Sequence, residues 1–273
     1  MMCGLVIIKG AGDIATGTAH RLYRCGFKVV MLEKRLPTVI RRTVSFAEAV
    51  YKGGVTVEGI TAEMADSLEK ARGLLEAGKI PVVVDPGWNF VKSIEPAVVV
   101  DAIIAKKNLG TSMEEAPVVI GLGPGFTAGV DVHAVVETQR GHNLGRVLLE
   151  GSAAPDTGVP GNIAGYSSER LLRSPGRGIF SALNEIGDFV ENGRTVATVE
   201  GIPVKASISG VLRGILKSGL FVGEGMKVGD IDPRGIRESC FTISDKSRAV
   251  AGGVLEAAMF LLGLKCRGKG SIK

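Results

Sequence analysis

The stretch VIIKGAGDIATG, from Val6 to Gly17, decides the fold of the first half of the chain. An apolar run that ends in a glycine loop is typical of a buried strand followed by a turn into a helix. Gly10 and Gly12, with Ala15 in third place, match the GxGxxG/A pattern of a nucleotide-binding βα turn. The amides at the start of such a helix attract anions. The stretch therefore predicts a strand, a glycine loop and an anion-binding helix start.

Two acidic residues belong to this predicted site. Glu33 ends the second apolar run, about 20 residues after the loop, where an acid can bind a ribose diol. Asp13 lies at the helix start, where it either caps the helix or repels a phosphate bound there. That repulsion is about 4 kcal/mol at ~4 Å and an effective dielectric near 20. A divalent cation, a neutral Asp13 or another ligand would remove the conflict.

Six short runs rich in Val and Ile mark the first half of the chain. Helical stretches lie between several of them, including one expected from Thr61 onward. Strands that are apolar on both faces and alternate with helices predict a doubly wound, Rossmann-like parallel sheet. The six runs are Leu5 to Ile8, Val29 to Leu32, Val55 to Glu58, Val82 to Asp85, Val98 to Asp101 and Val118 to Gly121.

A ligand crevice is expected at the carboxyl ends of the first and fourth of these runs. Gly10, Gly12 and Asp85 would face it, and so would Gly121, Gly123 and Gly125 of a second glycine loop. Backbone loops of this kind bind oxyanions through their amides.

The segment after the second glycine loop is expected to be helical and carries two of the three histidines. His133 and His142, together with Asp85, are the candidate catalytic residues. His133 and Glu137 are four residues apart, so a simple surface pair on a helix is the alternative. No histidine spacing indicates a metal site, and no nucleophile–base pair or GxSxG motif is present, so no reaction is assigned.

A basic loop follows Glu33. Arg35 is the candidate for binding a phosphate group, with Lys34, Arg41 and Arg42 beside it. The alternative is a solvated basic loop without a ligand.

The second half contains an internal repeat. GDFVENGRTVATV begins at Gly187, and the similar segment GLFVGEGMKVGDI begins at Gly219. Two related halves, joined by a strand–turn–strand, predict a small β-barrel with pseudo-twofold symmetry. The pattern resembles biotinyl/lipoyl-like barrel-sandwich domains. The hairpin VEGIPVKAS lacks a Met-Lys-Met centre and Lys205 comes too late in it, so no biotin or lipoate attachment is expected. A rigid docking or ligand-covering module is favoured.

The last segment, from Ser244, predicts a helix. Asp245 and Lys246 near its start become site candidates if the helix packs back on the first domain. Cys240 is interpreted as a buried, inert thiol rather than a reactive one. The predicted organisation is a Rossmann-like α/β domain at 1–172, the barrel at 173–235 and the C-terminal helix at 236–273.

Composition narrows the class of protein. The net charge of +5 suits anionic ligands, but no basic run interleaved with aromatics is present and aromatics are only 5%, which argues against nucleic acid. Cys3, Cys25, Cys240 and Cys266 form no CxxC pair, so neither zinc nor disulfides are expected. No apolar segment is long enough to span a membrane. We expect a cytoplasmic protein.

Several segments together resemble the YqeB family of accessory proteins of selenium-dependent molybdenum hydroxylases. They are KGAGDIATGTAHRLYRCGF, IRRTVSFAEAVY, VVVDAIIAKKN, GLGPGFTAGVDVHAVVETQRGHNLGRV, the barrel and CFTISDKSRAVAGGVLEA. XdhC-type maturation factors are a more distant likeness. The resemblance implies a maturation role and a molybdenum hydroxylase client, but no residue role.

Three hypotheses follow from the sequence. The first is an assembly factor that binds a molybdopterin-type cofactor or a nucleotide in the crevice. The second is an NAD(P)-dependent oxidoreductase that uses the same loop. The third is a non-catalytic docking module with a vestigial crevice.

Overall fold

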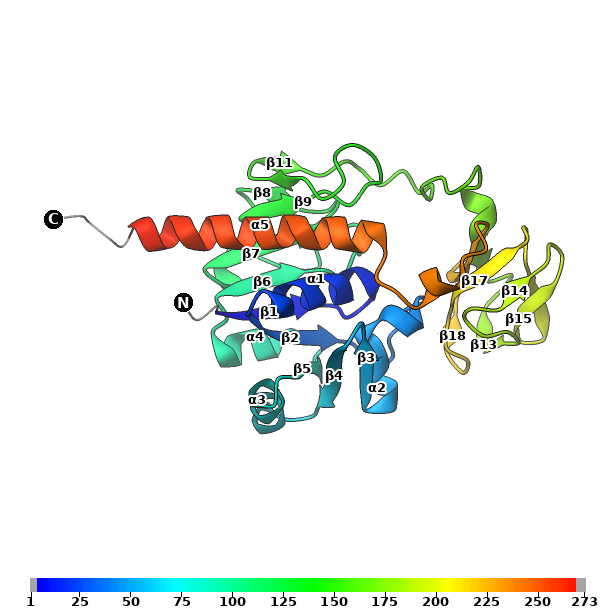
Figure 1. Ribbon diagram of the computed structural model, residues 1–273, viewed down its shortest axis with the longest axis horizontal. Coiled ribbons are helices and arrows are strands. Elements are labelled where there is room, and N and C mark those ends of the chain that lie inside the picture. The colour runs from blue at the N-terminus through cyan, green and yellow to red at the C-terminus, as the bar shows by residue number, and fades with distance from the viewer. Residues whose placement is uncertain (1–3, 269–273) are drawn as a thin grey trace.

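The computed structural model describes residues 4–268, apart from the side chains of Lys92 and residues 264–268. Cys3 and the side chain of Cys266 therefore lie outside the described part. A large, mostly parallel sheet forms one end of the molecule and two small antiparallel sheets form the other (Figure 1).

The large sheet has nine strands. The seven inner strands run parallel, and the strand at each edge is antiparallel to its neighbour. In spatial order they are β10 (Val147–Leu148), β9 (Ala134–Val136), β7 (Val118–Leu122), β6 (Val98–Asp101), β1 (Leu5–Lys9), β2 (Lys28–Glu33), β5 (Ile80–Val84), β4 (Ile60–Ala65) and β3 (Gly54–Val57).

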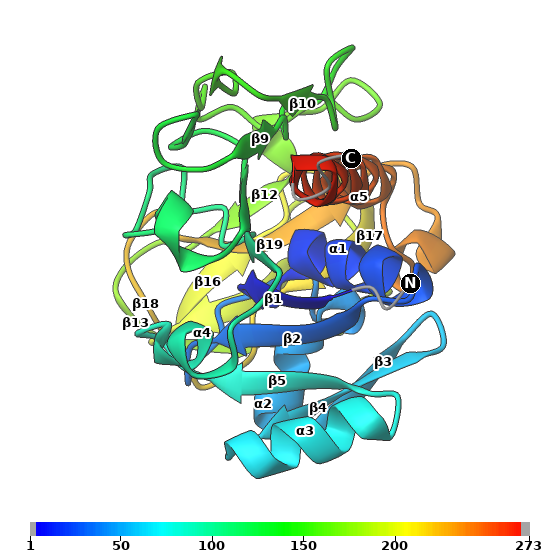
Figure 2. The same ribbon diagram turned by 90° about the vertical axis from the view of Figure 1, so that its left-hand side faces the viewer.

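Helices cover both faces of this sheet (Figure 2). On one face, α1 (Asp13–Arg24) and α5 (Asp245–Gly268) pack on Val6 and Ile8 of β1. On the other face, α3 (Leu68–Glu76) and α4 (Asn89–Ile94) pack on the alternate residue, Ile7. Since successive side chains of a strand point to opposite faces, the Val- and Ile-rich runs fill both layers.

The predicted sheet is present but one helix was predicted too long. All six apolar runs contain strands, and the run from Val55 to Glu58 overlaps the antiparallel edge strand β3, which ends at Val57. The helix expected from Thr61 was wrong there, because Thr61 lies in β4, which pairs with β3 through a turn at Glu58 and Gly59, both with positive φ. The helix α3 begins later, where Ser67 Oγ accepts from the amide of Lys70.

The helix expected after the second glycine loop was also wrong. Residues 134–136 form strand β9, which is fully buried and pairs in parallel with β7. Val132, Val135 and Val136 are buried β-branched residues, and the sheet edge offers them packing that outweighs the helical spacing.

The chain reverses its direction across the sheet between β1 and β6. Strands β2, β5, β4 and β3 lie to one side of β1, whereas β6, β7, β9 and β10 lie to the other. The carboxyl ends of β1 and β6 therefore flank the crevice in which such sheets bind ligands. The strand ending at Asp85 was expected there, but β2 separates it from β1.

Two four-stranded antiparallel sheets form the barrel part, residues 171–232. One has the order β12 (Leu171–Arg173), β19 (Lys227–Asp232), β17 (Gly210–Ile215) and β14 (Phe189–Val190). The other has the order β16 (Ile202–Lys205), β15 (Thr195–Val199), β13 (Gly178–Ala182) and β18 (Phe221–Val222). A single core of residues such as Phe180, Leu212 and Val228 lies between them.

The sequence repeat is visible in the strand pairing of the barrel part. Strands β13, β14 and β15 of the first copy correspond to β17, β18 and β19 of the second. The pair β14–β17 corresponds to β18–β13, and β13–β15 corresponds to β17–β19. Each half thus contributes strands to both sheets, as a pseudo-twofold axis requires.

Shorter elements complete the fold. They are the helix α2 (Ala49–Lys52), the two-stranded sheet of β8 (Thr127–Ala128) and β11 (Gly151–Ser152), and 3-10 helices at Arg42–Val44, Phe46–Glu48, Met113–Glu115, Ser168–Arg170 and Arg237–Cys240. Among residues 4–268, no helix is both long enough and apolar enough to cross a membrane.

Glycines let α5 lie close to its neighbours. A Cβ at Gly17 of α1 would come within 2.1 Å of Ser247 Oγ, and one at Gly253 would come within 2.2 Å of the Gly145 carbonyl oxygen. Ser247 Oγ donates to the carbonyl of Asp13 at 2.9 Å. The helix that returns from the barrel is therefore fixed against the helix of the first glycine loop.

Two adjacent glycines of α5 test this packing. A Cβ at Gly252 meets open space, whereas Gly253 contacts backbone. We expect Gly252→Ala to raise the free energy of unfolding by roughly 0.5–1 kcal/mol, because alanine favours a helix over glycine. We expect Gly253→Ala to lower it by about 1–3 kcal/mol. Chemical denaturation measures both, and equal effects of the two substitutions would contradict the close approach.

Candidate functional site

Two adjoining cavities lie at the carboxyl edge of the parallel strands. One, of about 670 Å³, is lined by the first glycine loop and the ends of β1, β2 and β6. The other, of about 640 Å³, lies between this edge, the barrel part and the start of α5. Both are lined by Asp13, Ile14, Arg41, Ile104 and Lys227, so they form one two-chambered cleft.

The first chamber opens onto the helix start predicted from the sequence. Gly10 has φ +91°, and a Cβ there would lie 3.1 Å from the Ala102 carbonyl oxygen, so this position requires glycine. Gly12 is the N-cap of α1 and supplies no side chain to cap it. No side chain of residues 4–268 accepts a hydrogen bond from the amides of residues 12–15. These amides are positioned to receive an anion.

Asp13 does not cap α1. Its carboxylate lies 3.4 Å from Nη1 of Arg41 and lines both chambers. Lys227 and Lys246 line the cleft as well; burial lowers the pKa of each lysine, and the charge of Asp13 acts in the opposite direction. Three cations therefore offset the repulsion that a lone aspartate would exert on a bound phosphate.

Glu33 is held by the backbone of the glycine loop. Its Oε2 accepts from the Ala11 amide at 3.0 Å and its Oε1 accepts from the Lys34 amide at 2.8 Å. Burial raises the pKa of Glu33, although these two amides act in the opposite direction. The carboxylate lines the first chamber, but each of its oxygens already accepts one hydrogen bond.

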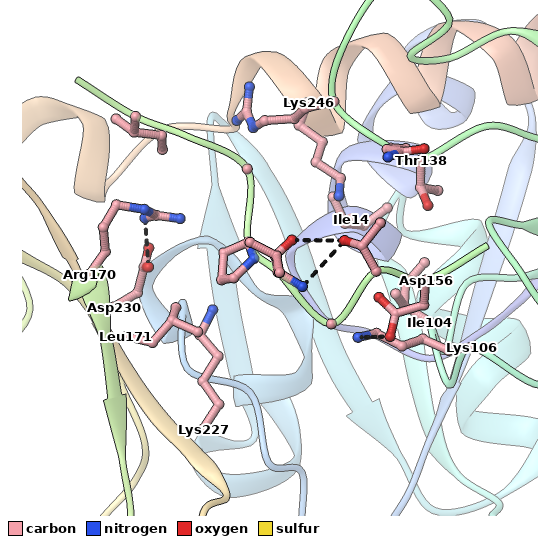
Figure 3. Close-up of a pocket in the computed structure, with 18 of the residues that line it drawn as sticks. Ile14, Ile104, Lys106, Thr138, Asp156, Arg170, Leu171, Lys227, Asp230 and Lys246 are labelled. Atoms are coloured by element: carbon pink, nitrogen blue, oxygen red, sulfur yellow. Dashed lines mark hydrogen bonds and ion pairs between the residues drawn. The ribbon is translucent and has the colours of Figure 1, made fainter. Parts of the chain in front are cut away.

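The second chamber is strongly cationic. Eight basic side chains and three acidic ones line it, which leaves an excess of positive charge. The basic residues are Arg41, Lys106, Arg140, Arg170, Arg173, Arg213, Lys227 and Lys246, and the acidic residues are Asp13, Asp156 and Asp230. Figure 3 shows that they come from both sides, with Lys246 on the side of α5 and α1, and Lys227, Arg170 and Asp230 on the side of the barrel part.

Glu137 positions two loops of the second chamber. It is 6% exposed, and its Oε1 accepts from the amides of Thr138 and Gln139, both at 2.7 Å. Its Oε2 accepts from the amide of Ala154 at 2.8 Å. The carboxylate thereby joins the segment that carries Arg140 to the loop at 154–161, and both line the chamber.

Three residues of the cleft have strained backbone. Trp88, Ile104 and Lys106 are not glycines, yet their φ angles are 56°, 59° and 61°. A positive φ is least favourable for a β-branched residue such as Ile104. Strained backbone conformations are common at ligand-binding sites. All three residues line one or both chambers.

The second glycine loop packs against protein instead of opening into the cleft. A Cβ at Gly121 would meet the ring of Phe126, one at Gly123 would meet Thr138, and one at Gly125 would meet the backbone of Lys107. None of the three glycines lines either chamber; within this loop Pro124 lines the second.

Four other candidates lie outside both chambers. Nδ1 of His133 accepts from the amide of Val119 at 3.0 Å, and His142 is exposed. Asp85 accepts from the amide of Phe90 at 2.6 Å and so holds the start of α4. Arg35 is exposed, whereas Arg41 of the same basic loop lines both chambers.

Cys240 is buried, and this burial raises the pKa of its thiol. Its Sγ lies 3.9 Å from the Leu212 carbonyl oxygen. These observations agree with an inert thiol. Within residues 4–268, no three His, Cys, Asp or Glu side chains are grouped so that they would hold a metal ion.

The barrel residues of the cleft were missed by the sequence interpretation. Arg213 lies in β17, GVLRGI, in which every residue is buried. Arg170 directly precedes β12, and Lys227 is the exposed first residue of β19. A buried arginine in the middle of an apolar strand needs an anionic partner, so the position of Arg213 in the sequence could have indicated a site. Asp245 and Lys246 were candidates: Lys246 lines the second chamber, whereas Asp245 does not line it but accepts two hydrogen bonds from Arg140, which does.

Glu137→Gln tests the positioning of the two loops. The amide nitrogen of glutamine would face a backbone N–H that now donates to Glu137 Oε2. We expect a loss of about 1–3 kcal/mol in the free energy of unfolding. Hydrogen exchange of residues 152–160 should become faster. Glu150→Gln, at an exposed position, is the matched control and should change neither quantity. Unchanged exchange in Glu137→Gln would show that the carboxylate does not hold the loop.

The chain was compared with known proteins and family models, and no protein-family model matches it. An aspartoacylase family protein from Mesorhizobium loti aligns over 85% of this chain and 85% of its own, at a TM-score of 0.26 and 14% identity. The ectoine utilization protein EutE from Ruegeria pomeroyi aligns over 84% of this chain and 85% of its own, at a TM-score of 0.26 and 11% identity. A succinylglutamate desuccinylase from a Silicibacter species aligns over 85% of both chains, at a TM-score of 0.25 and 12% identity. Scores this low support no argument about fold or activity.

A curated relative gives a much stronger match. The chain is 54% identical over 258 residues to the protein named "Uncharacterized protein YqeB" of Escherichia coli K12. The alignment covers 94% of this chain but 48% of that protein, so the chain spans about half the length of its relative. The chain is therefore a homologue of YqeB over that part of the relative's length.

Proposed function

We propose that the chain is an accessory protein for selenium-dependent molybdenum hydroxylases that binds a molybdopterin-type cofactor or a nucleotide in the two-chambered cleft. One observation carries the proposal: the uncapped start of α1 faces a cavity that continues into a cationic chamber. A ligand with a heterocycle at one end and phosphate at the other fits this division.

The first chamber suits a flat heterocycle. Its walls include Trp88, Ile103, Ile104 and Leu109, and its volume of about 670 Å³ is within the range of small-molecule sites. The indole of Trp88 offers an aromatic surface for stacking. The amides at the start of α1 lie at the boundary with the second chamber, where the phosphate of the ligand would begin.

The maturation role rests on the family resemblance and on homology to YqeB. The same proposal includes a client hydroxylase and a cytoplasmic location. It divides the chain into a Rossmann-like domain (1–172), a biotinyl/lipoyl-like barrel (173–235) and a C-terminal helix (236–273). In it, the barrel covers the ligand and the loops of the cleft release it to the client.

A nicotinamide dinucleotide is the second candidate, favoured by the glycine loop and by Glu33 at the end of β2. The hydrogen bonds that Glu33 accepts from Ala11 and Lys34 leave fewer lone pairs for a ribose diol. A docking module is the third candidate, and the exposed Phe189 and Phe221 of the barrel part favour it.

Release of the bound molecule separates the three candidates. The protein is purified from its own cells without a chelator, denatured, and the supernatant is analysed by absorbance and mass spectrometry. A pterin supports the proposal. A nicotinamide dinucleotide replaces it with the second candidate, and a protein that retains no small molecule replaces it with the third.

Gly12→Leu tests the position of the ligand without breaking the fold. Gly12 has φ −67°, which every residue adopts, and a Cβ there would lie an ordinary 3.5 Å from Val39. The leucine side chain should project into the first chamber at the start of α1 and reduce the co-purified ligand at least tenfold, while the melting temperature of the ligand-free protein stays the same. Gly73→Leu on the exposed face of α3 is the control and should retain the ligand. Retention in Gly12→Leu would place the ligand elsewhere.

A further inference from the structure

Three buried arginines of the second chamber have N–H groups without an acceptor. Arg41, Arg170 and Arg213 are only 6–7% exposed. They come from the loop after β2, from the 3-10 helix before β12 and from the middle of β17. Within residues 4–268, no group accepts a hydrogen bond from the Nε of any of them. A buried guanidinium donor without an acceptor is costly, so this cluster is incomplete by itself.

Arg41 pairs with Asp13 at 3.4 Å, but the other two arginines share one close carboxylate. Asp230 lies 2.7 Å from Arg170 and 3.7 Å from Arg213, so one carboxylate serves two guanidinium groups. The second partner of Arg213 is Asp232, at 4.0 Å. Asp232 is already bonded to Arg234 at 2.6 Å. The positive charge of Arg213 is therefore only weakly compensated.

Two lysines add to the positive charge. The ammonium groups of Lys227 and Lys246 make no hydrogen bond or ion pair within the described part of the chain, yet both side chains line the second chamber. They lie on opposite sides of it (Figure 3). Lys227 is exposed and Lys246 is partly exposed, but desolvation by the surrounding protein lowers the pKa of each lysine. The nearest carboxylates, Asp230 for Lys227 and Asp13 for Lys246, act in the opposite direction, and neighbouring cations act in the same direction. Like charges held together in this way destabilise the protein unless an anion lies between them.

We propose that this cluster is a diphosphate-binding site, with Arg41, Arg170 and Arg213 on its buried side and Lys227 and Lys246 at its entrance. The inference rests on the proposed function, since the diphosphate would belong to the same ligand. A diphosphate carries two or more negative charges and several acceptor oxygens, which would compensate the excess positive charge of the cluster. The cavity, of about 640 Å³, holds a group larger than a single phosphate.

The site needs both parts of the molecule. Arg41 and Lys246 are contributed by the sheet part and α5, Arg213 and Lys227 by the barrel part, and Arg170 by the 3-10 helix that leads into the barrel part. A bound diphosphate therefore joins the two parts. A ligand of this kind is a nucleoside diphosphate or another heterocycle with a diphosphate, whose ring lies in the first chamber.

The experiment measures binding of inorganic pyrophosphate and of inorganic phosphate to the full chain by calorimetry and thermal unfolding. We expect pyrophosphate to bind more tightly than phosphate and to raise the melting temperature by several degrees at saturation. Lys227→Gln and Lys246→Gln should each weaken pyrophosphate binding roughly tenfold. Without pyrophosphate, both variants should unfold at the same temperature as the parent or higher, because each removes a repelled charge.

Lys28→Gln is the matched control. It removes the same charge from an exposed position at the amino end of β2, the opposite edge of the sheet. Its pyrophosphate affinity should match the parent. Equal weakening in Lys28→Gln would mean that only net charge matters, and unchanged affinity in both cleft variants would overturn the site.

Different experimental results would contradict the diphosphate site and the proposed function. A pterin that co-purifies with a protein that does not bind pyrophosphate overturns the diphosphate site and leaves the proposed function. Pyrophosphate binding by a protein that retains a nicotinamide dinucleotide or no heterocycle supports the site and overturns the proposed function.

Discussion

One buried guanidinium, that of Arg41, joins the three parts of the chain that form the cleft. Its Nη1 lies 3.4 Å from Asp13 of α1, and its Nη2 donates to the carbonyls of Ser239 and Thr242 at 3.0 and 3.1 Å. Beside it, the amide of Ile215 donates to the carbonyl of Ile40, which attaches the loop after β2 to the barrel part. Because these contacts connect the glycine loop, the barrel part and the segment leading into α5, they fix the width of the cleft.

The charged groups of the cleft lower the free energy of unfolding of the protein. The excess of positive charge in the cleft lowers the stability of the empty protein, and the positive φ of Ile104 adds strain to the same walls. Away from these arginines the buried carboxylates differ: Glu137 accepts from three backbone amides, whereas Glu48 accepts no hydrogen bond. In the proposed site, this loss of stability would be offset by a bound anionic ligand.

The sequence was most informative where a pattern is local. The apolar runs and the glycine loop predicted the inner strands and the start of α1, since strand burial and turn geometry depend on neighbouring residues. It failed at β4 and β9, where pairing with a distant strand outweighs helical spacing. It also missed Arg170 and Arg213, because the cleft brings together residues far apart in the chain. The candidates His133 and Asp85 were chosen for their chemistry, but their ring nitrogen and carboxylate accept from nearby backbone amides.

The central claim is that one anionic ligand occupies both chambers. The most direct measurement is a crystal structure of the protein isolated from its own host with any bound molecule retained. We expect continuous electron density that begins at the amides of Gly12 and Asp13, passes Trp88 and reaches Arg213. A cleft occupied only by solvent, or closed by its own side chains against Gly12, would contradict it.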